Sequence, residues 1–250
     1  YAVYLMLFVV APLLVLFYYA FTNGSGQFTL SNFTGFFTDP NTMGTLFYSF
    51  AVAVVTTLVC LLLAYPIACI LAFSKLKAKS ALVMIFVLPM WINFSLRITA
   101  LKEILTVFEG NLAMYPFFNA VVGMTYDFLP FMILPIYTTV SRLDGALREA
   151  AMDLGANEVQ TFLRVTLPLS VPGIMSGISM VFLPAMTNYV VLDMLYNSTY
   201  IMGSLIGSYF SAYNWNGGSM IALILLGIIC LFTLLTDGGD ESTSRGGALL

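Results

Sequence analysis

The chain has 250 residues and a net charge of −3, with 60% hydrophobic residues and only 8% charged ones. Soluble domains have about 25% charged residues, so this composition excludes an ordinary soluble protein. Histidine is absent, which removes the commonest metal ligand and general base, and the three cysteines lie inside apolar runs. The sequence therefore predicts neither a catalytic site nor a metal site on this chain.

Six apolar stretches are each long enough to form a membrane-crossing helix, which needs about 20 residues. In chain order they cover residues 1–21, 46–73, 81–101, 118–140, 171–191 and 219–235. We therefore expect an all-α membrane protein with a single transmembrane domain over residues 1–235.

Lysine and arginine residues are distributed unequally between the two sides of this predicted bundle. Arg97 and Lys102 lie on one side, and the other seven basic residues lie on the opposite side: Lys75, Lys77, Lys79, Arg142, Arg148, Arg164 and Arg245. Because cytoplasmic loops of membrane proteins carry the excess of basic residues, we expect both chain termini in the cytoplasm. The segment 141–170 and a tail at 236–250 then face the cytoplasm.

A polar segment at residues 149–174, EAAMDLGANEVQTFLRVTLPLSVPGI, interrupts the apolar chain on this cytoplasmic side. Its beginning predicts a helix with one apolar face, which Gly155 ends because glycine readily adopts a positive φ. A second helical piece is expected at Glu158–Val165, stopped by Pro168, with another break where the fifth span begins. The sequence thus predicts a short helix–turn–helix along the membrane surface. From the residues alone, an ordinary cytoplasmic linker with an amphipathic helix is the alternative.

The same segment resembles the EAA motif of type I ABC importer permeases, whose pattern is E-A-A-x3-G-x6-F-x2-V-x-L-P-x3-P-G-I. Eleven positions match it: Glu149, Ala150, Ala151, Gly155, Phe162, Val165, Leu167, Pro168, Pro172, Gly173 and Ile174. The resemblance implies the six-helix fold of these permeases. It also implies that residues 141–170 form a coupling segment, whose helix docks into a groove on a cytoplasmic ATPase.

Transferred residue by residue, the resemblance gives Glu149 an ionic contact with the ATPase and gives Gly155 the turn. Ala150 and Ala151 would form a closely packed face, and Asp153 adds a second acidic group. The chain has no Gly-x4-Gly-Lys-Ser/Thr loop, so it is not expected to hydrolyse ATP. No cofactor is expected here, because ATP and Mg would bind the partner ATPase. The implied partners are two ATPase subunits, a second permease subunit, an external substrate-binding protein and the lipid bilayer, with no nucleic acid.

Three further segments narrow the resemblance to one subfamily of these permeases. Residues 88–105 read LPMWINFSLRITALKEIL, residues 126–156 read YDFLPFMILPIYTTVSRLDGALREAAMDLGA, and residues 214–225 read NWNGGSMIALIL. They are similar to spermidine/putrescine importer permeases, and to the B-type rather than the C-type subunit. This implies polyamine transport, a heterodimer with a C-type permease, and the bacterial inner membrane. Residues 187–200, TNYVVLDMLYNSTY, depart from that subfamily because they lack its usual Leu-Gly-Gly.

Acidic residues outnumber basic ones in the outer half of the chain, which would attract polyamines and repel anions. The five acids are Asp39, Glu103, Glu109, Asp127 and Asp193. Asp127 and Asp193 border spans, where ionisable groups are costly and usually functional. Trp91 and Tyr126 could hold ammonium groups by cation–π contacts, so we expect these four residues to mark the substrate path. Arg97 would repel such a cargo, and is interpreted as an orientation anchor or the partner of an acid.

The residues alone leave other interpretations of this path open. The five acids could be solvated or cap helices, Trp91 could be an ordinary packing residue, and Tyr126 could lie at the membrane interface. An importer permease for ferric ion, thiamine or sulfate would share the coupling segment. A secondary transporter would work without an ATPase, but would usually show paired repeats or a buried charge relay, and the sequence indicates neither.

Overall fold

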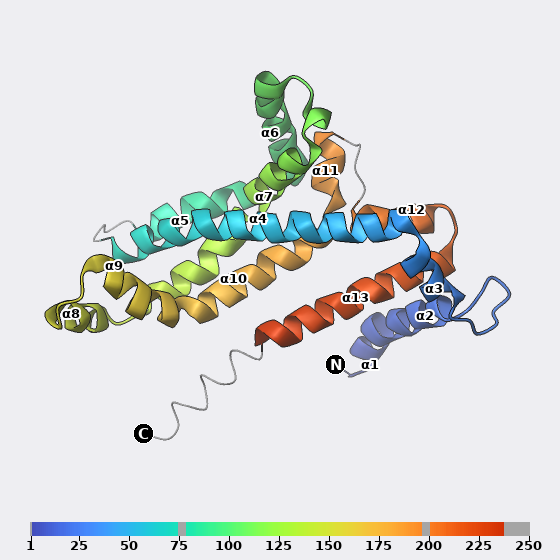
Figure 1. Cartoon of the computed structure of the whole chain (residues 1–250), viewed down its shortest axis with the longest axis horizontal. Coiled ribbons are helices and arrows are strands. Elements are labelled where there is room, and N and C mark those ends of the chain that lie inside the picture. The colour runs from blue at the N-terminus through green and yellow to red at the C-terminus, as the bar shows by residue number, and fades with distance from the viewer. Residues whose placement is uncertain (1, 75–78, 197–200, 238–250) are drawn as a thin grey trace. The chain divides into compact units, whose positions relative to one another are not determined.

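The computed structural model describes residues 2–74, 79–196 and 201–237 (Figure 1). Within these residues every regular element is a helix, apart from one isolated bridge between Thr22 and Phe28. The chain forms two compact units, of which the first comprises Tyr1–Ala51, Met186–Tyr189 and Thr199–Leu235. The second comprises Val52–Ala185, Val190–Ser198 and, at the end of the described chain, Thr236 and Asp237. The tail from residue 238 lies outside the described residues, and so do three of the basic residues on which the predicted charge asymmetry depends: Lys75, Lys77 and Arg245.

The first unit joins the beginning and the end of the described chain. Its elements are α1 (Ala2–Leu5), η1 (Met6–Val10), α2 (Ala11–Ala20), α3 (Ser31–Thr38), the start of α4 (Pro40–Phe73), α12 (Met202–Ser211) and α13 (Trp215–Asp237). The Asn216 side-chain amide donates to the carbonyl oxygens of Tyr19 at 3.0 Å and Thr22 at 2.7 Å. These two bonds hold the start of α13 against the end of α2 (Figure 1).

The second unit contains the coupling segment and most of the spans. Its elements are the rest of α4, α5 (Lys79–Val87), η2 (Leu88–Trp91), α6 (Phe94–Glu109), η3 (Leu112–Met114), α7 (Pro116–Val140), α8 (Gly145–Asp153), α9 (Glu158–Thr161), η4 (Phe162–Thr166), most of α10 (Leu167–Thr187) and most of α11 (Tyr189–Leu195). Across both units, five described helices are long and apolar enough to cross a membrane: Val3–Ala20, Pro40–Phe73, Pro116–Val140, Glu158–Thr187 and Trp215–Leu234.

The predicted third span, 81–101, is not one straight helix. Ala81–Trp91 and Phe94–Glu109 meet at a 95° bend, and only together do they supply a sixth span (Figure 1). Pro89 lies in the 3₁₀ turn before the bend, and Ile92 is extended. The Asn93 side chain then accepts hydrogen bonds from the backbone N–H groups of Ser95 and Leu96, which starts α6 as a new helix. An N-cap residue within the apolar run therefore divides the span.

The predicted helix end at Pro168 is wrong, and so is the further break at Pro172 and Gly173. The chain is helical from Glu158 to Thr187, because a π turn at Phe162–Thr166 leads directly into α10. In that widened turn the Leu167 N–H bonds to the Phe162 carbonyl, five residues back. Pro168 directly follows this widened turn, where the regular i→i−4 hydrogen-bond ladder that a proline would interrupt is already altered.

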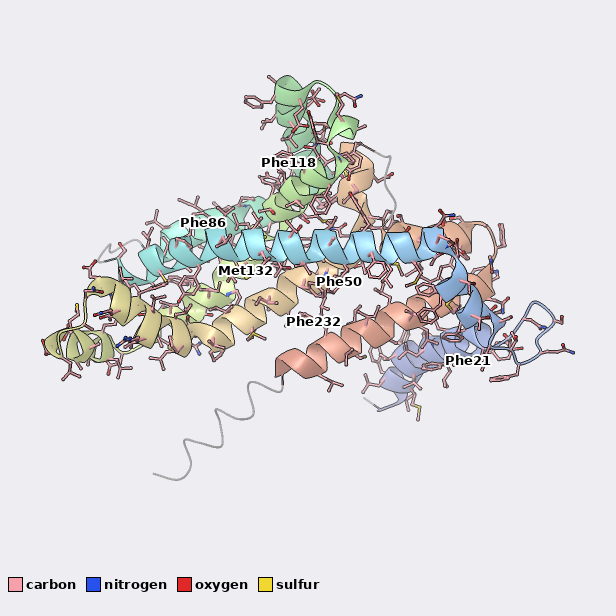
Figure 2. The ribbon with its side chains drawn as sticks, in the orientation of Figure 1. Phe21, Phe50, Phe86, Phe118, Met132 and Phe232 are labelled. Atoms are coloured by element: carbon pink, nitrogen blue, oxygen red, sulfur yellow. The ribbon has the colours of Figure 1, made fainter. Side chains whose placement is uncertain are left out.

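Two glycines let α10 approach α7 closely. A Cβ atom added to Gly173 would lie 2.5 Å from the Thr139 hydroxyl oxygen and 2.8 Å from the Pro135 carbonyl oxygen. A Cβ atom at Gly177 would lie 2.6 Å from the sulfur of Met132, a fully buried residue of α7 that Figure 2 labels. Close packing through small residues is a common way to associate helices in membranes. The two glycines therefore allow the backbones of α7 and α10 to pack in close contact.

Gly173→Ala should destabilise the protein. Alanine normally favours a helix over glycine by about 0.5–1 kcal/mol, but here its methyl group would meet a backbone oxygen that cannot rotate away. We expect a net loss of about 1–3 kcal/mol, seen as a lower thermal unfolding temperature in detergent. Gly227→Ala in α13 is the matched control, since nothing lies within 4 Å of the added atom. Equal unfolding temperatures of the two variants would contradict the close α7–α10 contact.

Candidate functional sites: a coupling segment and a buried ion pair

Helix α8 is defined at both ends by its own residues. At its start the Asp144 carboxylate accepts a hydrogen bond from the Ala146 N–H at 3.0 Å. At its end Gly155 has a φ of +88°, as predicted for the turn. The Ala156 N–H bonds to the Ala151 carbonyl at 3.1 Å, and the Gly155 N–H bonds to the Met152 carbonyl at 2.9 Å. This pair of bonds is the Schellman motif, in which glycine is favoured because of its positive φ.

Helix α9 begins immediately after this turn with a capping box. The Asn157 side chain accepts from the Gln160 N–H at 2.8 Å, and the Gln160 side-chain oxygen accepts from the Asn157 N–H at 3.1 Å. Since both residues satisfy backbone donors that would otherwise be unpaired, the new helix is well defined from its first residue. The chain thereby reverses between α8 and α9 and then continues without a break into α10.

Two sets of contacts join the coupling segment to α4. The Arg148 guanidinium of α8 lies over the Phe73 ring, 3.9 Å from its centroid, which is a cation–π contact. Tyr65 packs edge-on against Phe162 with ring centroids 5.6 Å apart, and its hydroxyl forms a 2.7 Å hydrogen bond with Ser170 of α10. The sequence marks Phe162 only as a motif position and gives no signal for Tyr65 or Ser170, because no local pattern marks a contact between residues this far apart.

The predicted coupling residues divide between two surfaces. Glu149, Ala150 and Asp153 are exposed on α8, and neither acid has an ion-pair partner within the described ranges. Ala151 is half-buried and, with Gly155, lines a pocket of about 310 Å³ between α8 and the following helical turns. We name this the coupling pocket, lined chiefly by Ala151, Gly155, Gln160, Thr161, Arg164 and Val165. Ala151 therefore faces the pocket, whereas Ala150 is exposed, so the two alanines do not form the single flat face that is expected from the sequence.

A buried ion pair lies where α6 passes α7. Arg97 Nη2 donates to Asp127 Oδ1 at 2.7 Å, and the residues are only 9% and 5% exposed. Asp127 lies near the middle of α7, so the charge pair is within a spanning helix rather than at its edge. Arg97 Nε and Nη1 are buried without a hydrogen-bond partner in the part of the chain that the structure describes. Of the two interpretations of Arg97, the structure supports the partner of an acid.

Two of the remaining outer acids also have structural partners. Asp39 caps α4: its carboxylate accepts from the Thr42 hydroxyl and from the Asn41 N–H, and these bonds, chiefly the first, lower its pKa below the usual value. Glu109 accepts from the amide of buried Asn119 at 2.8 Å, which ties the end of α6 to the start of α7. Asp193, in contrast, is exposed on α11 and has no ion-pair partner within the described ranges.

The four predicted path residues do not form one cluster. Trp91 is 86% exposed at the bend between η2 and α6. Tyr126 is 40% exposed and faces an apolar groove of about 590 Å³ between α4, α6 and α7, which Phe118 also lines. No hydrogen bond, ion pair or ring contact in the described part of the chain joins these two residues to Asp127 or Asp193. Among the described residues, Asp193 thus has no ion-pair partner, whereas Asp127 is paired with Arg97.

Comparison with known proteins identifies the family. Residues 64–240 match the family described as the inner membrane component of binding-protein-dependent transport systems. The chain belongs to this family. The spermidine/putrescine transport system permease protein PotB of Haemophilus influenzae is 34% identical over 97% of this chain and 92% of its own length. PotB of Escherichia coli is also 34% identical, over 83% of this chain and 81% of its length.

Solved structures show the same fold for this transport component. A chain from the crystal structure of a bacterial ABC transporter involved in alginate import matches with a TM-score of 0.78 at 15% identity, covering 96% of this chain and 92% of that chain. A second alginate transporter structure, in complex with a periplasmic protein, matches with a TM-score of 0.75 at 13% identity. The predicted type I importer permease fold and the predicted family are therefore confirmed.

Asp127→Asn should destabilise this transport component rather than simply remove a carboxylate. It would leave the Arg97 guanidinium buried without its counter-charge, at a cost of about 3–5 kcal/mol. The double variant Arg97→Met/Asp127→Leu removes both charges at similar volume and should recover most of the loss. Thermal unfolding in detergent measures both effects. If the single and double variants unfold at the same temperature, the pair does not stabilise the α6–α7 contact.

Proposed function

We propose that this chain is the permease subunit of an ATP-driven importer that carries polyamines, spermidine or putrescine, into the cytoplasm across a bacterial inner membrane. The observation that carries the proposal is the 34% identity to a spermidine/putrescine permease along 97% of the chain. The coupling segment supports the coupling to an ATPase, since α8 exposes Glu149 and Asp153, which have no ion-pair partner among the described residues, beside a defined turn. Both termini would be cytoplasmic, as the basic residues indicate.

The proposed importer needs several other polypeptides. Six spans make half of a permease pore in this family's architecture, so a distinct C-type permease would supply the second half. Two cytoplasmic ATPases would bind and hydrolyse ATP with Mg. An external binding protein would deliver the cargo, in agreement with the family's description as part of binding-protein-dependent systems. Glu149 and Asp153 would pair with basic residues of one ATPase.

A continuous set of contacts connects the proposed docking surface with the membrane interior. Arg148 and Tyr65 link the coupling segment to α4, and the unbroken helix Glu158–Thr187 leads from it into the bundle. That helix packs against α7 at Gly173, and α7 carries Asp127. Movement of α8 by the ATPase would therefore reach the ion pair through packed elements.

The proposed cargo path begins at the exposed carboxylate of Asp193. Polyamines carry several positive charges, so leaving water requires carboxylates or aromatic faces along the route. Trp91 and Tyr126 expose aromatic surface in the same unit. Asp127 is paired with Arg97, so it can hold a cargo ammonium group only after that pair opens.

The decisive experiment is reconstitution with the partner permease, the ATPase and a panel of solute-binding proteins. Spermidine or putrescine should stimulate ATP hydrolysis, and sulfate, ferric ion or thiamine should not. Ala150→Leu should abolish this stimulation, because the larger side chain on the exposed face of α8 prevents close docking. Ala212→Leu, at an exposed position in the other unit, is the control. Stimulated hydrolysis that survives in Ala150→Leu would contradict the docking role of α8.

The cargo path is tested separately through Asp193. Asp193→Asn should lower polyamine uptake at limiting substrate while basal ATP hydrolysis stays unchanged, since one attractive carboxylate is lost from an exposed position. Glu103→Gln is the matched control, because Glu103 is also exposed and acidic but lies on α6. Similar losses in the two variants would indicate diffuse attraction of cations rather than a defined path.

A further inference from the structure

The coupling pocket is open because small residues and a turn form its walls. Ala151 and Gly155 supply the α8 side, and apart from the two chain neighbours of Gly155 no described atom lies within 4 Å of the position that a Cβ on Gly155 would take. Its volume is about 310 Å³, whereas a water molecule in the liquid takes about 30 Å³. The pocket therefore has room for a whole side chain from another protein.

The polar side chains that line this pocket can all donate hydrogen bonds. Arg164 is exposed and has no carboxylate partner within the described ranges. Thr161 is only 2% exposed, and its hydroxyl has no hydrogen-bond partner among the described residues. The Gln160 side-chain oxygen is used by the capping box, so only its NH₂ group remains to face a ligand. No aspartate or glutamate lines the pocket, which makes it complementary to an anion.

The surroundings favour a carboxylate carried by a protein over a free anion or an anionic lipid. Glu149 and Asp153 are exposed on α8, the same helix that supplies Ala151 to the pocket, and their charges repel a uniformly negative surface. A protein surface can instead present bases to these two acids and an acid to Arg164. Such alternation of charge fixes the register of two docked surfaces.

We propose that the coupling pocket receives an acidic side chain of the cytoplasmic ATPase, whose carboxylate is held by Arg164, the Thr161 hydroxyl and the Gln160 amide. This inference rests on the proposed function, because it names a contact of the same docking surface. The ATPase then holds the permease from both sides of the α8–α9 turn. Since Thr161 and Arg164 belong to the helix that continues to Thr187, a pull on the pocket acts directly on α10.

The test measures the affinity of the ATPase for the complete permease complex in lipid nanodiscs, together with polyamine-stimulated hydrolysis. Arg164→Glu places a like charge against the incoming carboxylate and should weaken ATPase binding about tenfold or more. Arg164→Lys should retain most of the affinity, and Thr161→Val should lose part of it. Arg142→Glu is the matched control, because Arg142 is an exposed cation of the coupling segment outside the pocket.

Charge reversal on the ATPase identifies the partner residue. Each surface aspartate or glutamate of the ATPase is changed to arginine in turn, and each ATPase variant is combined with the Arg164→Glu permease. One ATPase variant should restore binding to the Arg164→Glu permease. The same variant should not improve binding to the Arg142→Glu permease. Equal affinities of the Arg164→Glu and Arg142→Glu complexes, or no restoring ATPase variant, would overturn the inference. If the unmodified complex itself fails to bind the ATPase, the proposed function fails instead, and the two failures are distinguishable.

Discussion

The uninterrupted helix from Glu158 to Thr187 is the element on which the rest of the second unit depends. It begins in the coupling segment and continues as one spanning helix, so movement at its start is carried along the helix. A proline at its eleventh residue would normally break such a helix, because it lacks an N–H and clashes with the preceding turn. The π turn at Phe162–Thr166 removes this conflict by widening the turn just before Pro168. Tyr65 then fixes the widened turn by packing on Phe162 and bonding to Ser170.

The break in the third span has the opposite effect. Ala81–Trp91 rises only about 16 Å, roughly half of the hydrocarbon thickness, so it cannot cross a membrane alone. Breaks of this kind leave backbone groups to be satisfied locally, and here the Asn93 side chain takes two of them. The bend also brings Arg97 to Asp127, 30 residues further along the chain. A buried charge pair beside a broken helix is a typical feature of transport proteins, where irregular backbone and ionisable groups occur together.

Much of this architecture could be predicted from the sequence, because a membrane imposes long apolar runs and a turn imposes glycine. Four long apolar helices overlap the predicted spans 1–21, 46–73, 118–140 and 219–235, whereas the third predicted span is bent and the fifth lies in a helix that already begins at Glu158. Gly155 adopts the predicted conformation. The break at Asn93 was not predicted, because the apolar run over 81–101 continues through it and a single asparagine does not show whether it caps a helix. The π turn could not be predicted, because its residue types are ordinary helix residues. The Arg97–Asp127 pair could not be predicted either, because it depends on the angle between two helices. The same holds for the coupling pocket, which depends on how the chain reverses between two short helices.

The two kinds of contact around α7 differ in how readily they can change. At Gly173 the approach to α7 involves backbone atoms, so α7 and α10 cannot slide past each other without separating. At Ile92 and Asn93 the chain leaves the regular helical hydrogen-bond ladder, and a few such residues can absorb a large change in dihedral angles. In the proposed importer, movement at the coupling segment would therefore carry α10 and α7 together. The accompanying change in backbone dihedral angles would occur at the bend before α6. The Arg97–Asp127 pair therefore lies between the moving α7 and this hinge.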